Sequence, residues 1–128
     1  TSNVKVWSSN TSYTQTQFDI NGRVIGGDIV TIARQEGNVI GFATVYFSFS
    51  STMTAKVGIM NDLFTLESYR GQGVGKALIN HCLEYALSQG AARLQWVTAL
   101  DNHRAQALYN SLATNNKPWL FYTYMPQA

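Results

Sequence analysis

The sequence has 128 residues and a mass of 14.2 kDa, the size of one ordinary domain, and we expect residues 1–128 to form a single domain. Hydrophobic residues make up 45% of the chain, as in packed globular proteins, whereas charged residues make up only 12%, about half the usual share. The net charge of +2 comes from scattered residues, without the basic cluster expected of a nucleic-acid-binding surface. A single cysteine excludes an internal disulfide and a structural zinc site.

The apolar segments of the chain are too interrupted to cross a bilayer. The longest of them, residues 39–49, contains Gly41, Thr44 and Ser48. The first ten residues lack the basic and then apolar segments of a signal peptide. We therefore expect a soluble, cytoplasmic domain with neither a membrane nor a nucleic acid as its partner.

The first half of the chain predicts strands. Residues 1–27 are polar with short apolar islands and show no amphipathic helical pattern. A β-prone run at 29–33, a polar turn at 35–38 and a strand at 39–49 predict a hairpin. After a Ser/Thr-rich turn, residues 56–66 predict the next antiparallel strand.

The second half alternates helices and strands. A glycine-rich turn at 69–75 leads into an amphipathic helix over about 74–89, with Gly90 well placed to end it and Cys82 on its core face. The remaining predicted elements are a strand over 92–97, a helix over 103–112 that Asp101-Asn102 can cap, and an aromatic strand over 119–124. This order of elements predicts an α/β or α+β domain with a mixed sheet.

The turn before the first helix carries the motif Arg70-Gly71-Gln72-Gly73-Val74-Gly75-Lys76. Because glycine has no side chain, a ligand can approach the backbone closely. A helix that begins there presents unpaired N–H groups and the positive end of its dipole. Together these features predict a pocket for phosphate oxygens, to which Arg70 adds a charge-assisted contact.

The spacing of this motif excludes two commoner nucleotide-binding loops. In a P-loop, Arg70 would have to be glycine and Ala77 would have to carry a hydroxyl. The dinucleotide fingerprint G-x-G-x-x-G would require glycine at Lys76 or at Leu78, depending on where the count begins.

The remaining pattern, [R/Q]-x-x-G-x-G, resembles the acyl-CoA-binding signature of the GNAT acetyltransferase superfamily, over residues 62–78. Residues 101–109 are similar to the second motif of that family, N-x-x-A-x-x-x-Y, which here runs from Asn102 to Tyr109. The resemblance covers about residues 29–124. It implies the GNAT fold, with a mixed, mostly antiparallel central sheet, flanking helices and a reduced N-terminal helical region.

The resemblance also implies a reaction. An amine of a small molecule would attack acetyl-CoA directly, with no metal, while Tyr109 as general acid protonates the departing CoA thiolate. The backbone of Phe64 and Thr65 would bind the pantetheine arm, and Asn102 would contact the arm near its sulfur. The pyrophosphate would be held by the motif residues, namely Arg70, Gly71, Gln72, Gly73, Val74, Gly75 and Lys76.

Within the superfamily, residues 61–64 and 118–120 resemble the diamine and spermidine/spermine acetyltransferase branch, which carries a Glu-Asp pair on this strand. Here Asn61 stands in place of the Glu, and Asp62 keeps the second acid. Asp62 would bind a cationic amine or relay its proton through water, with solvent as the alternative base. Polyamine, amino acid, aminoglycoside, peptide N-terminus and small xenobiotic all stay open as acceptors, and the resemblance implies a homodimer.

Each candidate residue also has a structural interpretation. The glycines can form a flexible turn, Asn102 a helix cap, Tyr109 a core aromatic and Asp62 a solvated surface charge. Two other functions remain beside the enzyme. One is a CoA-binding sensor without catalysis, and the other is an interaction domain whose missing helices come from a partner subunit.

Overall fold

The computed structural model describes residues 4–10, 17–18, 24–26, 29–51, 54–112 and 114–126, with side chains described from residue 30 onward. It divides the chain into two compact units, residues 1–98 and residues 99–128. Each unit is described by itself below.

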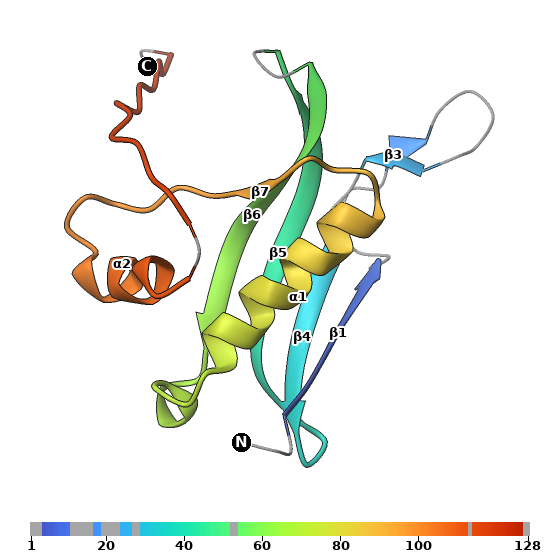
Figure 1. Ribbon diagram of the computed structural model, residues 1–128, viewed down its shortest axis with the longest axis vertical. Helices are drawn as coiled ribbons and strands as arrows, with labels where there is room; N and C mark the ends of the chain where they lie inside the picture. Colours follow the sequence, from blue (N-terminus) through green and yellow to red (C-terminus); the bar gives the residue numbers. More distant parts are fainter. Residues whose placement is uncertain are drawn as a thin grey trace. The chain divides into compact units, whose positions relative to one another are not determined.

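The larger unit is built on a five-stranded sheet (Figure 1) with the order β1-β4-β5-β6-β7. All neighbouring strands are antiparallel except β6 and β7, which are parallel, so the predicted mixed, mostly antiparallel sheet is confirmed. The strands predicted near 29–33, 39–49 and 56–66 are confirmed as β4, β5 and β6. The bounds are β1 (Val4–Asn10), β4 (Ile29–Gln35), β5 (Asn38–Ser50), β6 (Ala55–Thr65) and β7 (Leu94–Gln95).

A small separate ladder lies in the sequence between β1 and β4. It joins β2 (Gln17–Phe18) to β3 (Val24–Gly26) in antiparallel pairing. The described residues of this connection are therefore strand, where the GNAT resemblance led us to expect a reduced helical region. The neighbouring residues 11–16, 19–23 and 27–28 lie outside the described part of the chain.

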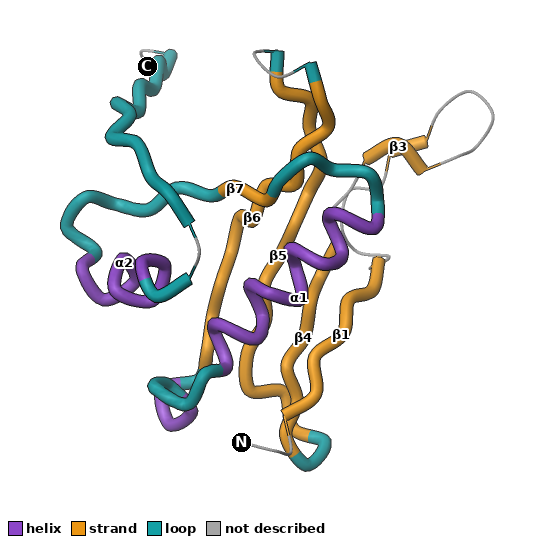
Figure 2. Tube along the Cα trace, in the orientation of Figure 1, coloured by secondary structure: helices purple, strands orange, loops and turns teal. Residues whose placement is uncertain are grey.

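One helix, α1 (Val74–Ser88), lies across one face of the sheet (Figures 1 and 2) and confirms the predicted amphipathic helix. Gly90, with φ of +86°, follows its C-terminus, where Ala91 N–H donates to the Ala86 carbonyl at 3.0 Å. Burial raises the pKa of the Cys82 thiol, as expected for a core cysteine. The buried residues of the helix are Val74, Leu78, Ile79, Cys82 and Ala86.

Two glycines in the sheet let α1 lie close to it. A Cβ at Gly41 would come within 2.8 Å of the Phe64 carbonyl oxygen and 3.3 Å of Val74 Cγ1. A Cβ at Gly58 would stand 3.0 Å from the Ala86 Cβ. The close approach at Gly41 fixes the start of α1 beside the end of β6, where the glycine motif lies.

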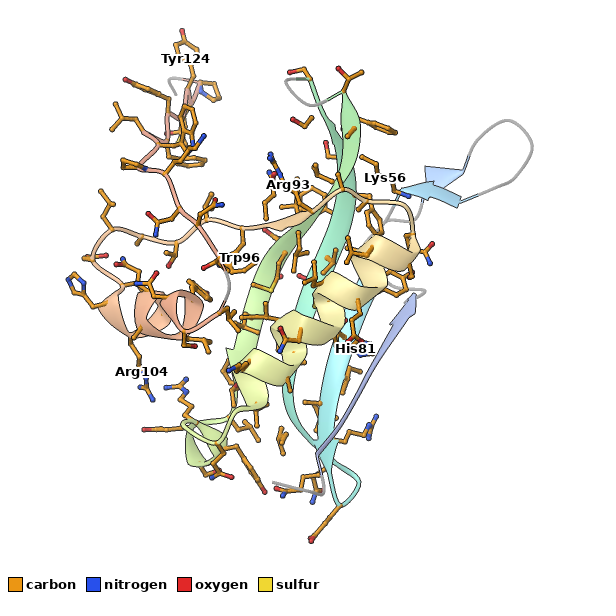
Figure 3. All side chains as sticks on the ribbon, in the orientation of Figure 1. Lys56, His81, Arg93, Trp96, Arg104 and Tyr124 are labelled. Atoms are coloured by element: carbon orange, nitrogen blue, oxygen red, sulfur yellow. The ribbon has the colours of Figure 1, made fainter. Side chains whose placement is uncertain are left out.

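The last strand of the sheet is shorter than the sequence predicts. The expected strand over 92–97 is reduced to β7, which pairs only Leu94 and Gln95 with Gly58 and Ile59 of β6. At this end of β6, Lys56 Nζ donates to the Gln89 carbonyl at 2.9 Å, near the C-terminus of α1 (Figure 3).

The smaller unit, residues 99–128, contains α2 (His103–Asn110), which confirms the second predicted helix although it ends two residues earlier. The predicted aromatic strand over 119–124 is wrong, since residues 114–126 form neither helix nor strand. A strand needs a hydrogen-bonded neighbour, and α2 is the only regular element among the described residues of this unit. Among the described residues, neither α1 nor α2 has the length and hydrophobicity of a bilayer-spanning helix.

Candidate functional site

The segment between β6 and α1 is held in place by its own side chains. After β6 ends at Thr65, residues Glu67–Tyr69 form one 3₁₀ turn. Arg70 Nε donates to the Thr65 carbonyl at 3.2 Å, and Gln72 Nε2 donates to the Ser68 carbonyl at 3.2 Å. Two side chains of the motif therefore hold the turn together, and the Nη groups of Arg70 can still reach an anion.

The glycines of the motif have two different roles. Gly71 and Gly73 have φ of +77° and +84°, in the left-handed region that side chains disfavour. No heavy atom lies within 4 Å of a Cβ built at either one, so the space beside both is open. Gly75 instead is the second residue of α1 and needs no special backbone conformation.

The N-terminus of α1 has no side-chain cap. Its N-cap residue is Gly73, and the first helical bond runs from Ala77 N–H to the Gly73 carbonyl at 3.0 Å. The preceding N–H groups, on Val74, Gly75 and Lys76, have no partner in the helix and lie at the positive end of its dipole. The side chain of Val74 is buried, so Val74 offers only its backbone. This arrangement suits an anion such as a phosphate.

The outer edge of β6 leads toward this terminus. Because β7 pairs only with Gly58 and Ile59, residues 60–65 have no strand beside them on that edge among the described residues. Phe64 and Thr65 lie on this stretch, and the Thr65 carbonyl also accepts the bond from Arg70. An extended ligand arm could bond to this edge as an added strand does.

Asp62 lies on β6 beside a β-bulge. The pairing of β5 with β6 aligns Thr44 with Asp62 and Val45 with Met60, so Asn61 is the extra residue of the bulge. Thr44 Oγ1 donates to Asp62 Oδ2 at 2.8 Å and accepts from the Asp62 backbone N–H at 3.2 Å. Thr44 could not be predicted as a neighbour of Asp62, because the bulge that aligns the two residues leaves no local sequence signal.

An aromatic pair lies next to this polar pair. Phe42 and Phe64 are aligned across β5 and β6, with ring centroids 5.7 Å apart. Gly41 lies on the sheet face that packs against α1. Side chains alternate along a strand, so Phe42 and Thr44 lie on the other face. A carboxylate beside two aromatic rings suits an amine with an apolar body.

In the smaller unit, Asn102 caps α2 as its structural interpretation predicts. Its Oδ1 accepts a hydrogen bond from the Ala105 backbone N–H at 3.2 Å. Gln106 Nε2 strengthens the same turn by donating to the carbonyls of Ala99 and Leu100 at 2.9 and 3.0 Å. The amide nitrogen of Asn102 is not needed for the cap and can still donate to a ligand.

Tyr109 lies on α2, seven residues after this cap. Its side chain is half-buried, and burial raises the pKa of the phenol above its ordinary value of 10.0. The phenol is therefore protonated at neutral pH, as a proton donor must be.

The predicted residues thus fall into two groups. One group follows the end of β6 into the start of α1, and its members are Asp62, Phe64, Thr65, Arg70, Gly71, Gln72, Gly73, Val74, Gly75 and Lys76. The other group, Asn102 and Tyr109, lies at the cap and on the body of α2 in the smaller unit.

Several known proteins are similar to this chain in sequence or in fold. D-amino-acid N-acetyltransferase HPA3 of Saccharomyces cerevisiae is 39% identical over 79 residues, which are 62% of this chain and 49% of that protein. Thialysine N-epsilon-acetyltransferase of Mus musculus is 30% identical over 94 residues, covering 70% of this chain and 55% of the relative. The chain therefore spans about half the length of these curated relatives.

The fold agrees with these sequence matches. An integron cassette protein from the mobile metagenome of V. cholerae superposes with a TM-score of 0.71 at 29% identity, over 78% of this chain and 62% of that one. Residues 3–113, from β1 through α2, match the acetyltransferase (GNAT) family. The predicted GNAT fold is confirmed, and the chain belongs to the acetyltransferase (GNAT) family.

Proposed function

We propose that the protein is an N-acetyltransferase that moves an acetyl group from acetyl-CoA to a primary amine of a small molecule. The observation that carries this proposal is the start of α1, where uncapped backbone N–H groups follow the left-handed Gly71 and Gly73. Membership of the acetyltransferase (GNAT) family supports the same conclusion.

Acetyl-CoA would bind in three parts. Its pyrophosphate would accept hydrogen bonds from the backbone N–H groups of residues 71–76, with the Arg70 guanidinium beside it. Its pantetheine arm would bond to the outer edge of β6 at Phe64 and Thr65. The amide nitrogen of Asn102 would donate to the arm near the sulfur. Acetyl-CoA supplies the activated acetyl group, and the proposal includes no metal.

The acceptor amine would bind at Asp62. The carboxylate would attract the ammonium form, and the rings of Phe42 and Phe64 would contact its apolar body. Relatives whose names describe N-acetylation of thialysine and of D-amino acids support an amine as acceptor.

The transfer would proceed by direct attack. The ammonium group first loses a proton to water held by Asp62 or to solvent, and the neutral nitrogen then attacks the thioester carbon. The C–N bond forms, the C–S bond breaks, and the CoA sulfur takes a proton from the Tyr109 hydroxyl. The new amide nitrogen then loses its second proton to solvent, and the Tyr109 phenolate takes a proton back from solvent. The raised pKa of Tyr109 supports this role, since the phenol keeps its proton until the thiolate forms.

The test is the release of CoA thiol from acetyl-CoA across a panel of diamines, amino acids, aminoglycosides and aromatic amines. We expect at least one aliphatic amine to stimulate release well above the rate of hydrolysis, with the acetylated amine identified by mass spectrometry. If no amine of the panel stimulates release, the proposed enzyme activity is wrong.

One observation favours a second function, a CoA-binding sensor without turnover. Asn61, where the diamine branch has an acid, is an exposed amide in the bulge and cannot act as a base. Calorimetric binding of CoA together with no turnover of any amine would support this second function.

We further propose that residues 1–128 act as one domain and as a homodimer in the cytoplasm, with neither nucleic acid nor membrane as partner. The family resemblance supports the homodimer. The scattered charge supports the absence of a nucleic-acid partner. Light scattering with and without CoA would test the oligomeric state, and a monomeric mass under both conditions would contradict the homodimer.

A further inference from the structure

We propose that Thr44 is a positioning residue that holds the Asp62 carboxylate ready for the amine acceptor. This inference rests on the proposed function. It adds a residue that belongs neither to the glycine motif nor to the motif on α2. Thr44 lies on β5, eighteen positions before Asp62, and reaches it only because the two strands pair.

The Thr44 hydroxyl makes two hydrogen bonds to the same residue. It donates its proton to Asp62 Oδ2 at 2.8 Å, and it accepts from the backbone N–H of Asp62 at 3.2 Å. Both distances are within the normal range for such bonds. The first bond involves a charged acceptor and belongs to the stronger class of hydrogen bonds. The side chain and the main chain of Asp62 are therefore tied to one oxygen atom.

The β-bulge explains why a side chain performs this task. With Asn61 as the extra residue, the regular pairing of β5 and β6 shifts next to Asp62. The N–H of Asp62 then bonds to the hydroxyl of Thr44. The β-branched side chain of threonine has few rotamers, so the hydroxyl that accepts this bond is itself stiff.

In this arrangement the two oxygens of the Asp62 carboxylate have different partners. Oδ2 is bonded to Thr44, which fixes the plane of the carboxylate, and Oδ1 can accept a hydrogen bond from an ammonium group. The Phe42–Phe64 pair lies directly beside it on the same sheet face, aligned at the next same-face position of both strands. A fixed carboxylate next to aromatic rings binds an aliphatic ammonium group in one orientation, whereas a rotating carboxylate would not.

The decisive variant is Thr44→Val, which keeps the β-branched shape and removes only the hydroxyl. We expect the KM for the best amine of the panel to rise about tenfold, because one hydrogen bond to a charged group is lost. The KM for acetyl-CoA should stay within about twofold of wild type. Thr44→Ser, which restores the hydroxyl, should recover most of the amine affinity.

Ser48→Ala is the matched control. Ser48 lies on the same strand and the same face as Thr44, is exposed, and loses the same chemical group. Its KM values should equal those of wild type. An equal rise of both KM values in Thr44→Val, without recovery in Thr44→Ser, would indicate a general disturbance of the sheet and would overturn the positioning role.

A double-mutant cycle with Asp62→Asn tests whether Thr44 acts through Asp62. If it does, Thr44→Val should change the amine KM by less than about twofold in the Asp62→Asn background, instead of tenfold. Equal effects in both backgrounds would overturn the inference.

The two possible failures are distinguishable. A wild-type protein that turns over no amine overturns the proposed function, and with it this inference. A wild-type protein that is active, with Thr44→Val unchanged in its amine KM, leaves the proposed function intact and overturns only the role of Thr44.

Discussion

The two helices that carry predicted site residues, one in each unit, begin in opposite ways. The N-cap of α1 is Gly73, which has a left-handed backbone and no side chain that could cap the helix. α2 begins at Asn102, whose side chain accepts from the Ala105 N–H. The N-terminus of α1 is therefore left open for a ligand, whereas α2 satisfies its own N-terminus.

The two helices therefore offer different groups to a ligand. α1 offers main-chain donors and the positive end of its dipole, and its first turn contains no acidic side chain that would repel an anion. α2 offers side chains, above all Tyr109, and its first turn carries Arg104 at the end where cations are unfavourable. Stability at the N-terminus of α2 therefore depends on the cap.

The largest effect should follow from removing the side-chain contribution of α2. We expect Tyr109→Phe to lower kcat about 1000-fold, within the range of about 100- to 10,000-fold that a general acid contributes. Stopped-flow detection of the released thiol, at saturating acetyl-CoA and amine, would measure this loss. Tyr85→Phe on α1, another half-buried tyrosine, is the control and should keep wild-type kcat.

The pH profile sharpens this assignment. Burial raises the pKa of Tyr109 above 10.0, and only the protonated phenol can donate, so kcat should persist up to about pH 10 and fall above it. Wild type and Tyr109→Phe are profiled with the same amine, so that the titration of the acceptor is common to both curves. If kcat falls at the same alkaline pH in Tyr109→Phe as in wild type, a group other than Tyr109 causes the fall.

The next largest effect should come from closing the open terminus of α1. Gly73→Asp places a side chain and a negative charge where the pyrophosphate would bind, and we expect the Kd for CoA to rise about 100-fold through the loss of several charge-assisted bonds. Isothermal calorimetry with CoA measures this change.

A glycine elsewhere in the chain controls for backbone strain. Gly37, at the turn between β4 and β5, has the same φ of +84° and the same open surroundings as Gly73. Gly37→Asp should therefore cost similar stability and leave CoA binding unchanged. Equal losses of CoA affinity in the two variants would contradict a phosphate site at α1.

A smaller effect should follow from opening the terminus of α2. Asn102→Ala removes the cap and should destabilise α2 by about 1 kcal/mol. Hydrogen exchange at the Ala105 amide, the donor of the lost bond, should become faster. Asn102→Asp retains a capping oxygen and should keep the protection of Ala105.

The same two variants separate the cap from a contact with CoA. Aspartate has no amide nitrogen, so Asn102→Asp should raise the KM for acetyl-CoA if that nitrogen donates to the ligand. An unchanged KM in Asn102→Asp would leave Asn102 as a cap alone.

Most of the strands and helices, and the start of both helices, could be predicted from local sequence patterns. Runs of β-prone residues between polar turns predicted β4 to β6, helical periodicity predicted α1, and the Asp101-Asn102 pair indicated the cap of α2. The open terminus of α1 was predicted because alternating glycines directly before an amphipathic run are a local signal. All of these depend on residues a few positions apart.

The features that depend on distant residues were missed or mistaken. The aromatic stretch 119–124 has strand-forming residues, but pairing requires a neighbour that no local pattern supplies. The contact of Thr44 with Asp62 depends on the register of β5 and β6 and on the bulge at Asn61. The close packing of α1 depends on Gly41, a residue that looks like an interruption of a strand in the sequence and permits contact with Val74 in the fold.

The smallest effect should come from Arg70, the charged residue beside the open terminus. Its Nε is anchored on the Thr65 carbonyl, which leaves the two Nη groups to reach a phosphate. Lysine keeps the charge and loses this anchored fork, so we expect Arg70→Lys to raise the KM for acetyl-CoA about threefold at low salt. Because Arg70 is exposed, the difference should shrink at high ionic strength. Arg104→Lys, in the first turn of the capped α2, should change nothing. An equal rise of the KM for acetyl-CoA in both variants would show that the effect does not depend on the position of the arginine. It would contradict a specific contact between Arg70 and the phosphate at the start of α1.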